Sequence, residues 1–160
     1  MFTATALVQL ADRKKIDLHA EVNSHLKKVK VPESFGQPVT GAQLLSHTSG
    51  LDEIRPGTQA ESPNAILPLG QFLKDRLVRV HPTGLITSYS TYGITLAGLL
   101  VEEISGLSYE TYLNRNIWKP LEMNRTHIST PPHLTAVAEV EILSSLVRVE
   151  NVPGLSMKIR

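Results

Sequence analysis

Hydrophobic residues recur at helical spacing from the first residues of the chain onward. The first such segment predicts an amphipathic helix over residues 2–10, which the polar run 12–15 ends. Nothing ahead of this helix can cap its first turn, which we interpret as a first indication that a segment before Met1 is missing. A second, short helix is expected after Thr40, because Thr40 and Gln43 have the spacing of a capping box.

Three further helices follow from the same pattern. An apolar stripe that runs from Leu69 to Leu77 predicts a helix that ends before His81 and Pro82. The clearest helix is expected to begin at Ser90 or Thr91 and to end at Gly106, where a left-handed residue is favoured. Its successor is expected to begin at Ser108 and to end before Pro120. The expected core positions of these helices are Leu69, Phe72, Leu73, Leu77, Leu96, Leu99, Leu100, Ile104, Tyr109, Tyr112, Leu113 and Ile117.

The last thirty residues have a different pattern. Residues 138–142 alternate like a strand, although the wider spacing of apolar residues around them also fits a helix. We favour the helix. The change of pattern near Pro131 is the one candidate boundary in the chain, and it divides residues 1–130 from a divergent segment, 131–160.

Composition limits the classes of function. The chain has 160 residues, of which 41% are hydrophobic and 5% aromatic, enough for one domain with a modest core. A formal net charge of +1 offers no electrostatic footprint for nucleic acid, which we exclude as a partner. The longest apolar stretch, 94–101, is far shorter than the ~20 residues of a membrane-spanning helix. Residues 2–10 lack the order of a signal peptide, so the localisation stays open.

The first thirty residues are locally basic. Lysines and arginines cluster at 13–15 and again at 27–30. We interpret this cluster as a solvated face rather than a binding patch.

Metal and cofactor chemistry have little support in the sequence. The chain has no cysteine, and its six histidines are scattered, none paired with a carboxylate at ligand spacing. It also has neither a phosphate-binding glycine loop nor the Gly-x-Ser-x-Gly elbow of α/β-hydrolases. We therefore expect no metal site and no bound cofactor.

Three stretches carry a more specific signal. They are residues 2–18, the sequence Leu-Leu-Ser-His-Thr-Ser-Gly-Leu at 44–51, and the run from Tyr89 to Met123. In this order they resemble the serine β-lactamase and penicillin-binding-protein superfamily, in the branch of class C β-lactamases, D-alanyl-D-alanine carboxypeptidases and related esterases. The resemblance covers roughly residues 2–127.

This resemblance implies an acyl-enzyme mechanism that needs a Ser-x-x-Lys pair, in which the lysine helps to take the proton from the attacking serine. In relatives the pair lies just ahead of the residues that match Phe2, so it would fall immediately upstream of this chain. The one such pair present, Ser24 and Lys27, follows the nucleophile helix and is expected by chance. We expect a surface role for it and no catalytic competence in the chain as it stands.

Two site residues follow from the resemblance. Tyr89 matches the family's Tyr-x-Asn tyrosine, which acts in proton transfer, and Thr91 stands where the asparagine contacts substrate. We expect Tyr89 to be catalytic and Thr91 to bind substrate; the alternative is that Tyr89 is an amphipathic residue at a helix entrance. The third motif, a Lys- or His-x-Gly triplet late in the chain, is missing, because the similar residues 81–84 precede the second motif.

The resemblance also implies a structural role for residues 47–50. Ser49 and Gly50 are expected to shape a turn, and His47 to satisfy backbone groups beside it. A serine–histidine pair is not expected, because residues two apart at a helix end do not face each other.

Together these observations predict a predominantly α fold: the helical subdomain of the β-lactamase/transpeptidase-like α+β fold, with most of the sheet domain missing. The predicted function is that of a truncated serine hydrolase lineage. With the missing regions restored, its substrate would be a small-molecule or peptide amide or ester. The alternative is a noncatalytic helical module that binds a partner, with self-association through exposed apolar surface.

Overall fold

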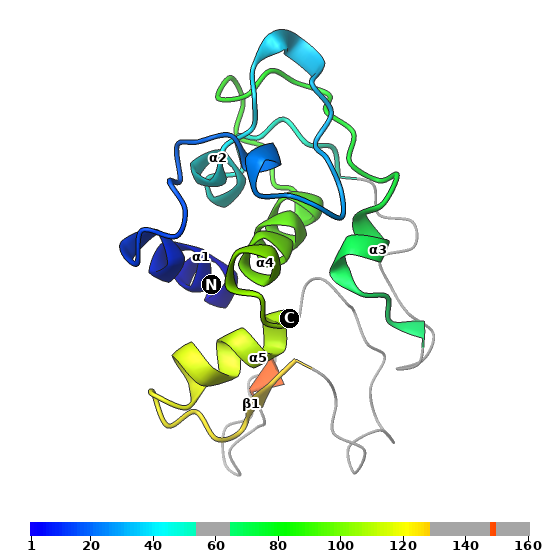
Figure 1. Ribbon diagram of the computed structural model, residues 1–160. Helices are drawn as coiled ribbons and strands as arrows, with labels where there is room; N and C mark the ends of the chain where they lie inside the picture. Colours follow the sequence, from blue (N-terminus) through cyan, green and yellow to red (C-terminus); the bar gives the residue numbers. More distant parts are fainter. Residues whose placement is uncertain (54–64, 129–147, 150–160) are drawn as a thin grey trace, which may run out of the picture.

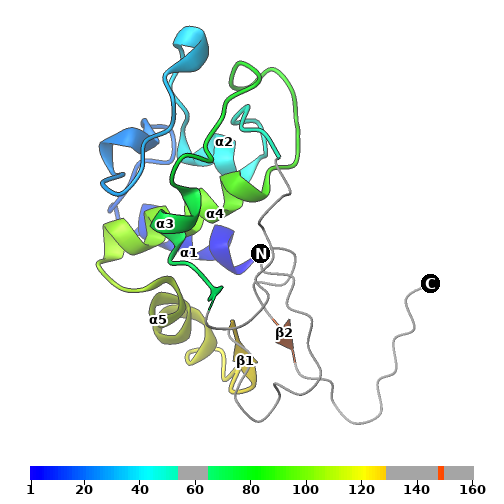
Figure 2. The same cartoon turned by 90° about the vertical axis from the view of Figure 1, so that its right-hand side faces the viewer.

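A computed structural model describes residues 1–53, 65–128 and 148–149. One helix, α4, lies at the centre, and four others surround it (Figures 1 and 2). Most of the α4 side chains are buried, since it contacts a neighbour on each side. The helices are α1 (Phe2–Asp12), α2 (Gly41–Leu45), α3 (Leu69–Leu73), α4 (Thr91–Ser105) and α5 (Tyr109–Leu113).

The α1 helix presents the predicted apolar face to α4. Ala6, Leu7 and Leu10 are buried there. No side chain caps its first turn, as expected, and Met1 occupies the N-cap position.

The predicted caps are confirmed at three helices. Thr40 and Gln43 form the reciprocal capping box that begins α2. Ser90 rather than Thr91 caps α4, because its hydroxyl accepts a hydrogen bond from the Gly93 amide at 3.0 Å. Gly106 ends α4 in the left-handed conformation, and the Ser108 hydroxyl caps α5.

The α3 helix is shorter than predicted. It ends at Leu73, because Lys74 turns to extended backbone and Asp75 adopts a left-handed φ of +61°. Leu77 is nevertheless buried, so the apolar stripe correctly marks core positions while its last member lies outside the helix. An aspartate tolerates the left-handed region better than most residues, which allows the early turn.

The α5 helix continues directly into a π-helical turn, η4 (Asn114–Trp118). The Trp118 ring is buried and meets Phe2 of α1 edge-on, with ring centroids 6.1 Å apart. A buried hydrogen bond of 2.5 Å joins the hydroxyls of Thr3 and Tyr109. The segment after α4 therefore packs back onto the first helix of the chain.

The described residues contain little strand. β1 (Thr126–His127) pairs antiparallel with β2 (Arg148–Val149), and two isolated bridges join other segments. Two 3-10 turns, η1 (Val22–Ser24) and η2 (Ser34–Gly36), complete the architecture. The described part is mostly helical, in agreement with the predicted class, whereas the helix expected after Pro131 lies outside it. No described helix has the length and apolar character that a membrane crossing requires.

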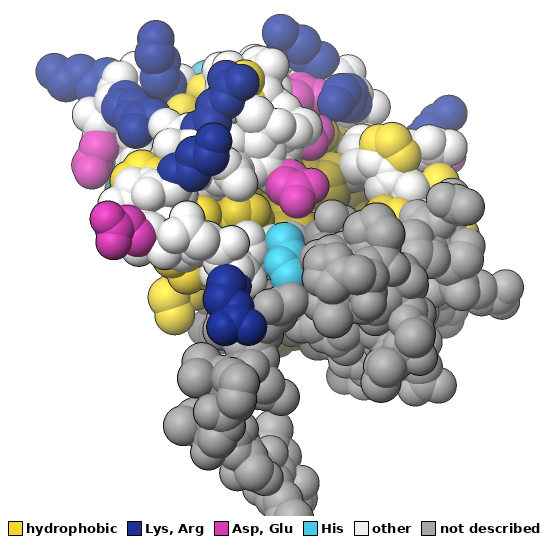
Figure 3. Space-filling model, turned by 90° about the horizontal axis from the view of Figure 1, so that it is seen from below, with side chains coloured by type: hydrophobic (Ala, Val, Ile, Leu, Met, Phe, Trp, Pro, Cys, Tyr) yellow, Lys and Arg dark blue, Asp and Glu magenta, His cyan; other side chains and the backbone are white. Residues whose placement is uncertain are grey.

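The basic cluster of the first thirty residues is exposed, as predicted. Figure 3 shows Lys and Arg side chains along the edge of the face seen there, with acidic side chains nearby. The backbone amides of Lys27 and Lys28 donate to the Glu103 carboxylate, and the Lys28 ammonium lies 3.5 Å from Glu102. These contacts fasten the basic segment to the C-terminal part of α4.

Candidate functional site at the N-terminus of α4

Two loops run side by side into the N-terminus of α4. The segment 47–52 pairs with the segment 78–88 through backbone hydrogen bonds. The bonds are Gly84 N to Thr48 O, Val80 N to Gly50 O and Ser88 N to His47 O, each 2.8 Å, and Asp52 N to Val78 O, 2.9 Å.

The close approach of these loops requires glycine at position 50. Gly50 has a φ of +74°, and a Cβ atom built there would lie 2.0 Å from the His81 carbonyl oxygen. The Ser49 hydroxyl, which is buried, accepts from the Leu51 amide at 3.4 Å. The turn-shaping role predicted for Ser49 and Gly50 is confirmed.

His47 connects the turn to the helix. Its Nδ1 accepts a hydrogen bond from the Ser90 backbone amide at 3.2 Å, which is the backbone role predicted for it. Its ring also stacks on the ring of Tyr89, with centroids 4.7 Å apart and planes tilted by 36°. His47 adopts a left-handed φ of +56°, so its stacked position carries a backbone cost.

Tyr89 is the most accessible member of this site. Its side chain is 59% exposed, and within the described part of the chain no hydrogen bond forms to its hydroxyl. The phenol is therefore open to solvent. The stacked imidazole of His47 limits the directions in which the ring can turn.

Thr91 occupies a different environment. It is 8% exposed, and its hydroxyl donates to the carboxylate of Glu53, which also accepts from the Thr91 backbone amide. A carboxylate at this place is favoured by the positive end of the α4 dipole. The sequence analysis missed Glu53, because no motif marks it and 38 residues separate it from Thr91.

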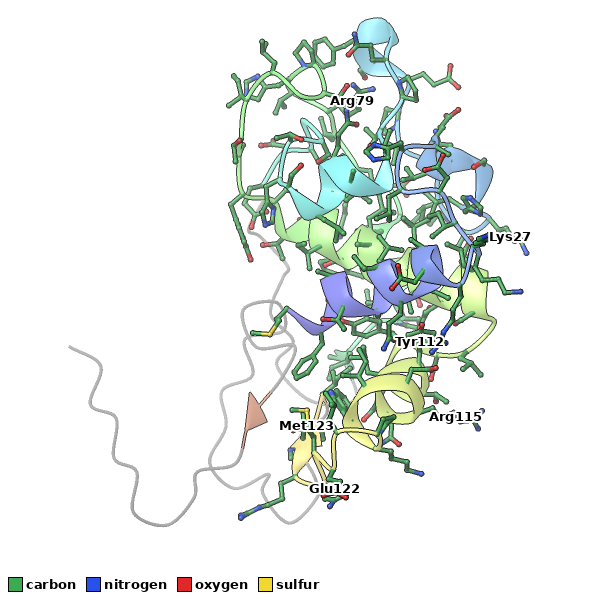
Figure 4. All side chains as sticks on the ribbon, turned by 90° about the vertical axis from the view of Figure 1, so that its left-hand side faces the viewer. Lys27, Arg79, Tyr112, Arg115, Glu122 and Met123 are labelled. Carbon is green, nitrogen blue, oxygen red and sulfur yellow. The ribbon has the colours of Figure 1, made fainter. Side chains whose placement is uncertain are left out.

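The structure thus brings Tyr89, Thr91 and His47 together around one helix end. It does not bring the Ser24 and Lys27 pair there. Ser24 lies in η1 and donates its hydroxyl proton to the Glu21 carbonyl at 2.6 Å, and Lys27 lies beyond that turn at the molecular edge (Figure 4). Among residues 1–53, 65–128 and 148–149, no three His, Asp or Glu side chains lie together as a metal site would need.

Comparison with known proteins places this site in context. The family model described as Beta-lactamase matches residues 1–138. The chain belongs to the beta-lactamase family. Both the 44–51 segment and the Tyr89 segment lie within the matched region.

Other members of the beta-lactamase family are similar over most of this chain. Protein flp of Staphylococcus aureus (strain N315) is 26% identical over 132 residues, covering 78% of the chain and 26% of its own length. The D-alanyl-D-alanine-carboxypeptidase/endopeptidase AmpH of Escherichia coli (strain K12) is 26% identical over 137 residues, or 82% of the chain and 35% of AmpH.

Solved structures of the family are also similar to this chain. The Beta-lactamase/D-alanine Carboxypeptidase from Yersinia pestis is 29% identical and superimposes with a TM-score of 0.68 over 83% of this chain and 39% of its own. The chain therefore spans between a quarter and two fifths of the length of these relatives.

Proposed function

We propose that this chain carries one part of a serine acyl-transfer site, namely the tyrosine that moves a proton. It does not carry the Ser-x-x-Lys pair that supplies the nucleophile. The observation that supports this most is the exposed Tyr89 phenol, stacked on His47 at the N-terminus of α4. In this proposal Tyr89 takes part in proton transfer to or from the reacting group. The substrate class is a small amide or ester, as the names of the carboxypeptidase relatives suggest.

Thr91 has a subordinate role in this proposal. Its hydroxyl already donates to Glu53, so a substrate would have to compete with that carboxylate for the proton. A hydroxyl also lacks the two amide donors of an asparagine. We therefore expect Thr91 to bind substrate weakly, and only when Glu53 accepts from the Thr91 backbone amide alone.

The chain alone is proposed to be inactive. Its one Ser-x-x-Lys pair, Ser24 and Lys27, lies away from Tyr89, and the Ser24 hydroxyl is engaged with a backbone carbonyl. We further propose that residues 1–130 form the family part of the chain and residues 131–160 a divergent segment. In this proposal Ser24 is not the serine that attacks a carbonyl.

Incubation with acylating substrates tests this proposal. The chain is mixed with a chromogenic cephalosporin, a short-chain nitrophenyl ester and a fluorescent penicillin, and adducts are sought by intact-mass spectrometry. We expect neither turnover nor a covalent adduct. An adduct or turnover lost in Ser24→Ala but kept in the matched control Ser34→Ala would overturn the proposal.

A second candidate function is a noncatalytic interaction module. Large apolar side chains are exposed along the loop that leads to α4, where Leu85 is 69% exposed and Ile86 and Tyr89 lie close in sequence. Exposed apolar surface of this kind favours association, here with a second copy of the chain.

Light scattering at increasing protein concentration tests the second candidate. We expect the mass to rise with concentration and an apolar dye to bind. The double change Leu85→Ser and Ile86→Ser is expected to abolish both, whereas Leu121→Ser, at another exposed position, is expected to leave both unchanged. A monomer that binds no dye would contradict this candidate.

A further inference from the structure

A pocket lies away from the Tyr89 site. It has a volume of about 320 Å³ and lies between the η2 turn and the segment that carries Arg79, and its lining includes no residue of the Tyr89 site. In Figure 4, Arg79 lies near the top of the molecule, beneath the loop that contains η2. The volume suits a small molecule.

In the segment around Arg79 the charged side chain is buried and the neighbouring apolar side chains are exposed, the reverse of the usual pattern. Arg79 is 5% exposed, whereas its neighbours Val78 and Val80 are 44% and 41% exposed. An extended segment normally turns its valines inward and its arginine to solvent. Loss of valine burial and desolvation of a cation are both unfavourable, so the inversion requires a compensating interaction.

The guanidinium of Arg79 is only half satisfied. Its Nη1 donates to the carbonyls of Gln37 at 2.7 Å and Pro32 at 3.3 Å. Its Nε and Nη2 atoms are buried and have no hydrogen-bond partner. Burial without a counter-charge lowers the pKa of this guanidinium from its ordinary value.

The unsatisfied atoms define the chemistry that fits them. Nε and Nη2 form the side-on edge of the guanidinium, whose two parallel N–H groups match the two oxygens of a carboxylate. A single water molecule would satisfy one of these donors well and leave the charge uncompensated. A carboxylate satisfies both donors and the charge.

Two acidic residues at the same pocket restrict the ligand further. Glu21 and Glu33 belong to the lining, and both are exposed. They would repel a simple anion and attract a cationic group nearer the solvent. We propose that this pocket binds a small zwitterion, with its carboxylate on the side-on edge of Arg79 and its ammonium group toward Glu21 and Glu33.

Access to Arg79 passes the η2 turn. The half-exposed Phe35 ring covers the guanidinium at 5.6 Å, and Phe35 and Gly36 both have left-handed φ values of about +66° and +67°. A left-handed phenylalanine is strained, so a turn conformation that moves Phe35 out of this φ region would recover that cost. A small shift of the Phe35 ring would open the side-on edge to the pocket.

The Arg79 Nε–H resonance reports ligand binding directly. The chain is titrated at constant ionic strength with the zwitterions glycine, 4-aminobutanoate and 6-aminohexanoate, and with butanoate and butylamine as half-ligands. We expect a saturable shift of this resonance with at least one zwitterion, which binds about threefold or more tightly than either half-ligand.

Variants distinguish the site from unspecific binding. Glu33→Gln, at an exposed position, is expected to weaken the zwitterion to the level of butanoate, while the exposed control Arg115→Lys leaves its affinity unchanged. Arg79→Lys is expected to abolish binding, which calorimetry measures because this variant lacks the Arg79 resonance. If Arg79→Lys does not fold, the titrations of the wild type and of Glu33→Gln decide whether the pocket binds a zwitterion. The absence of a saturable shift, equal binding of zwitterion and butanoate, or unchanged affinity in Glu33→Gln would overturn the proposal. Because the readout is binding, its failure leaves the acyl-transfer proposal untouched.

Discussion

The two ends of α4 are both held by carboxylates, yet they differ in what they leave free. At the C-terminal end, Glu102 accepts from the Tyr109 amide at 2.9 Å, and Glu103 accepts from the amides of Lys27 and Lys28. Glu103 thus joins segments far apart in the sequence, and Glu102 joins α4 to the start of α5. At the N-terminal end, Glu53 binds Thr91, while the adjoining Tyr89 stays exposed.

The C-terminal end of α4 thus serves the fold, whereas the N-terminal end carries the candidate functional residues. The carboxylates of the C-terminal end join other segments to α4, which suits a scaffold. The N-terminal end combines a left-handed His47, a tightly packed Gly50 and an exposed phenol, and strained positions of this kind are typical of functional sites. Four tests, two of them with a matched control variant, examine whether the two ends differ in this way.

The largest effect is expected from Gly50→Ala, beside the N-terminal end. The new methyl group would lie 2.0 Å from the His81 carbonyl oxygen, and the φ of +74° disfavours any side chain. We expect the free energy of unfolding to fall by at least about 3 kcal/mol in urea denaturation. Gly106→Ala at the C-terminal end is the matched control, because its φ is +72° but its Cβ would meet nothing within 4 Å. It should lose about 1 kcal/mol. Equal losses would remove the proposed difference between the ends.

The next effect concerns the carboxylates themselves. Glu53→Gln removes a charge that the positive end of α4 favours, and we expect a loss of about 1 kcal/mol, measured by thermal and urea denaturation. Glu103→Gln removes a charge that the negative end of the helix disfavours, so its loss should be smaller. A greater loss in Glu103→Gln would contradict this assignment.

Alkaline pH provides a third test. Burial raises the pKa of Tyr109, and its hydrogen bond with Thr3 opposes this only in part. The unfolded chain therefore loses the Tyr109 proton first as pH rises above about 10, so stability is complete below that pH and declines above it. Tyr109→Phe is expected to cost about 1 kcal/mol at neutral pH and to flatten the alkaline decline. Equilibrium unfolding between pH 8 and 11 measures both; an unchanged slope would refute the cause given.

The smallest effect is expected from Tyr89→Phe. The side chain is exposed and its hydroxyl makes no hydrogen bond within the described part of the chain, so the free energy of unfolding should change by less than about 0.5 kcal/mol. A loss above about 1 kcal/mol would give Tyr89 a structural role and would weaken its place in the proposed chemistry.

Local signals were sufficient to predict the helices. Capping hydroxyls at Thr40, Ser90 and Ser108 and the glycine at 106 act within a few residues, so they can be read from the sequence. The end of α3 was predicted too late, because the apolar stripe continues through the turn at Asp75 without interruption.

Contacts between distant residues could not be predicted in this way. The bonds of Glu53 to Thr91 and of Glu103 to Lys27 span 38 and 76 residues, and no spacing rule connects such positions. The burial of Arg79 was also hidden, since its alternation with Val78 and Val80 is typical of the opposite orientation. Of these contacts, the proposed role of Thr91 depends on its bond to Glu53, and the proposed zwitterion site depends on the buried Arg79.

The hydrogen bond between Thr3 and Tyr109 joins residues 106 apart, and α1 packs chiefly against α4 and α5. This arrangement has a consequence for biosynthesis. When α1 leaves the ribosome, its apolar face has no partner until residues 91–118 have also been made. Until then Ala6, Leu7 and Leu10 stay uncovered, and the core around α1 closes only when α4 and α5 are present.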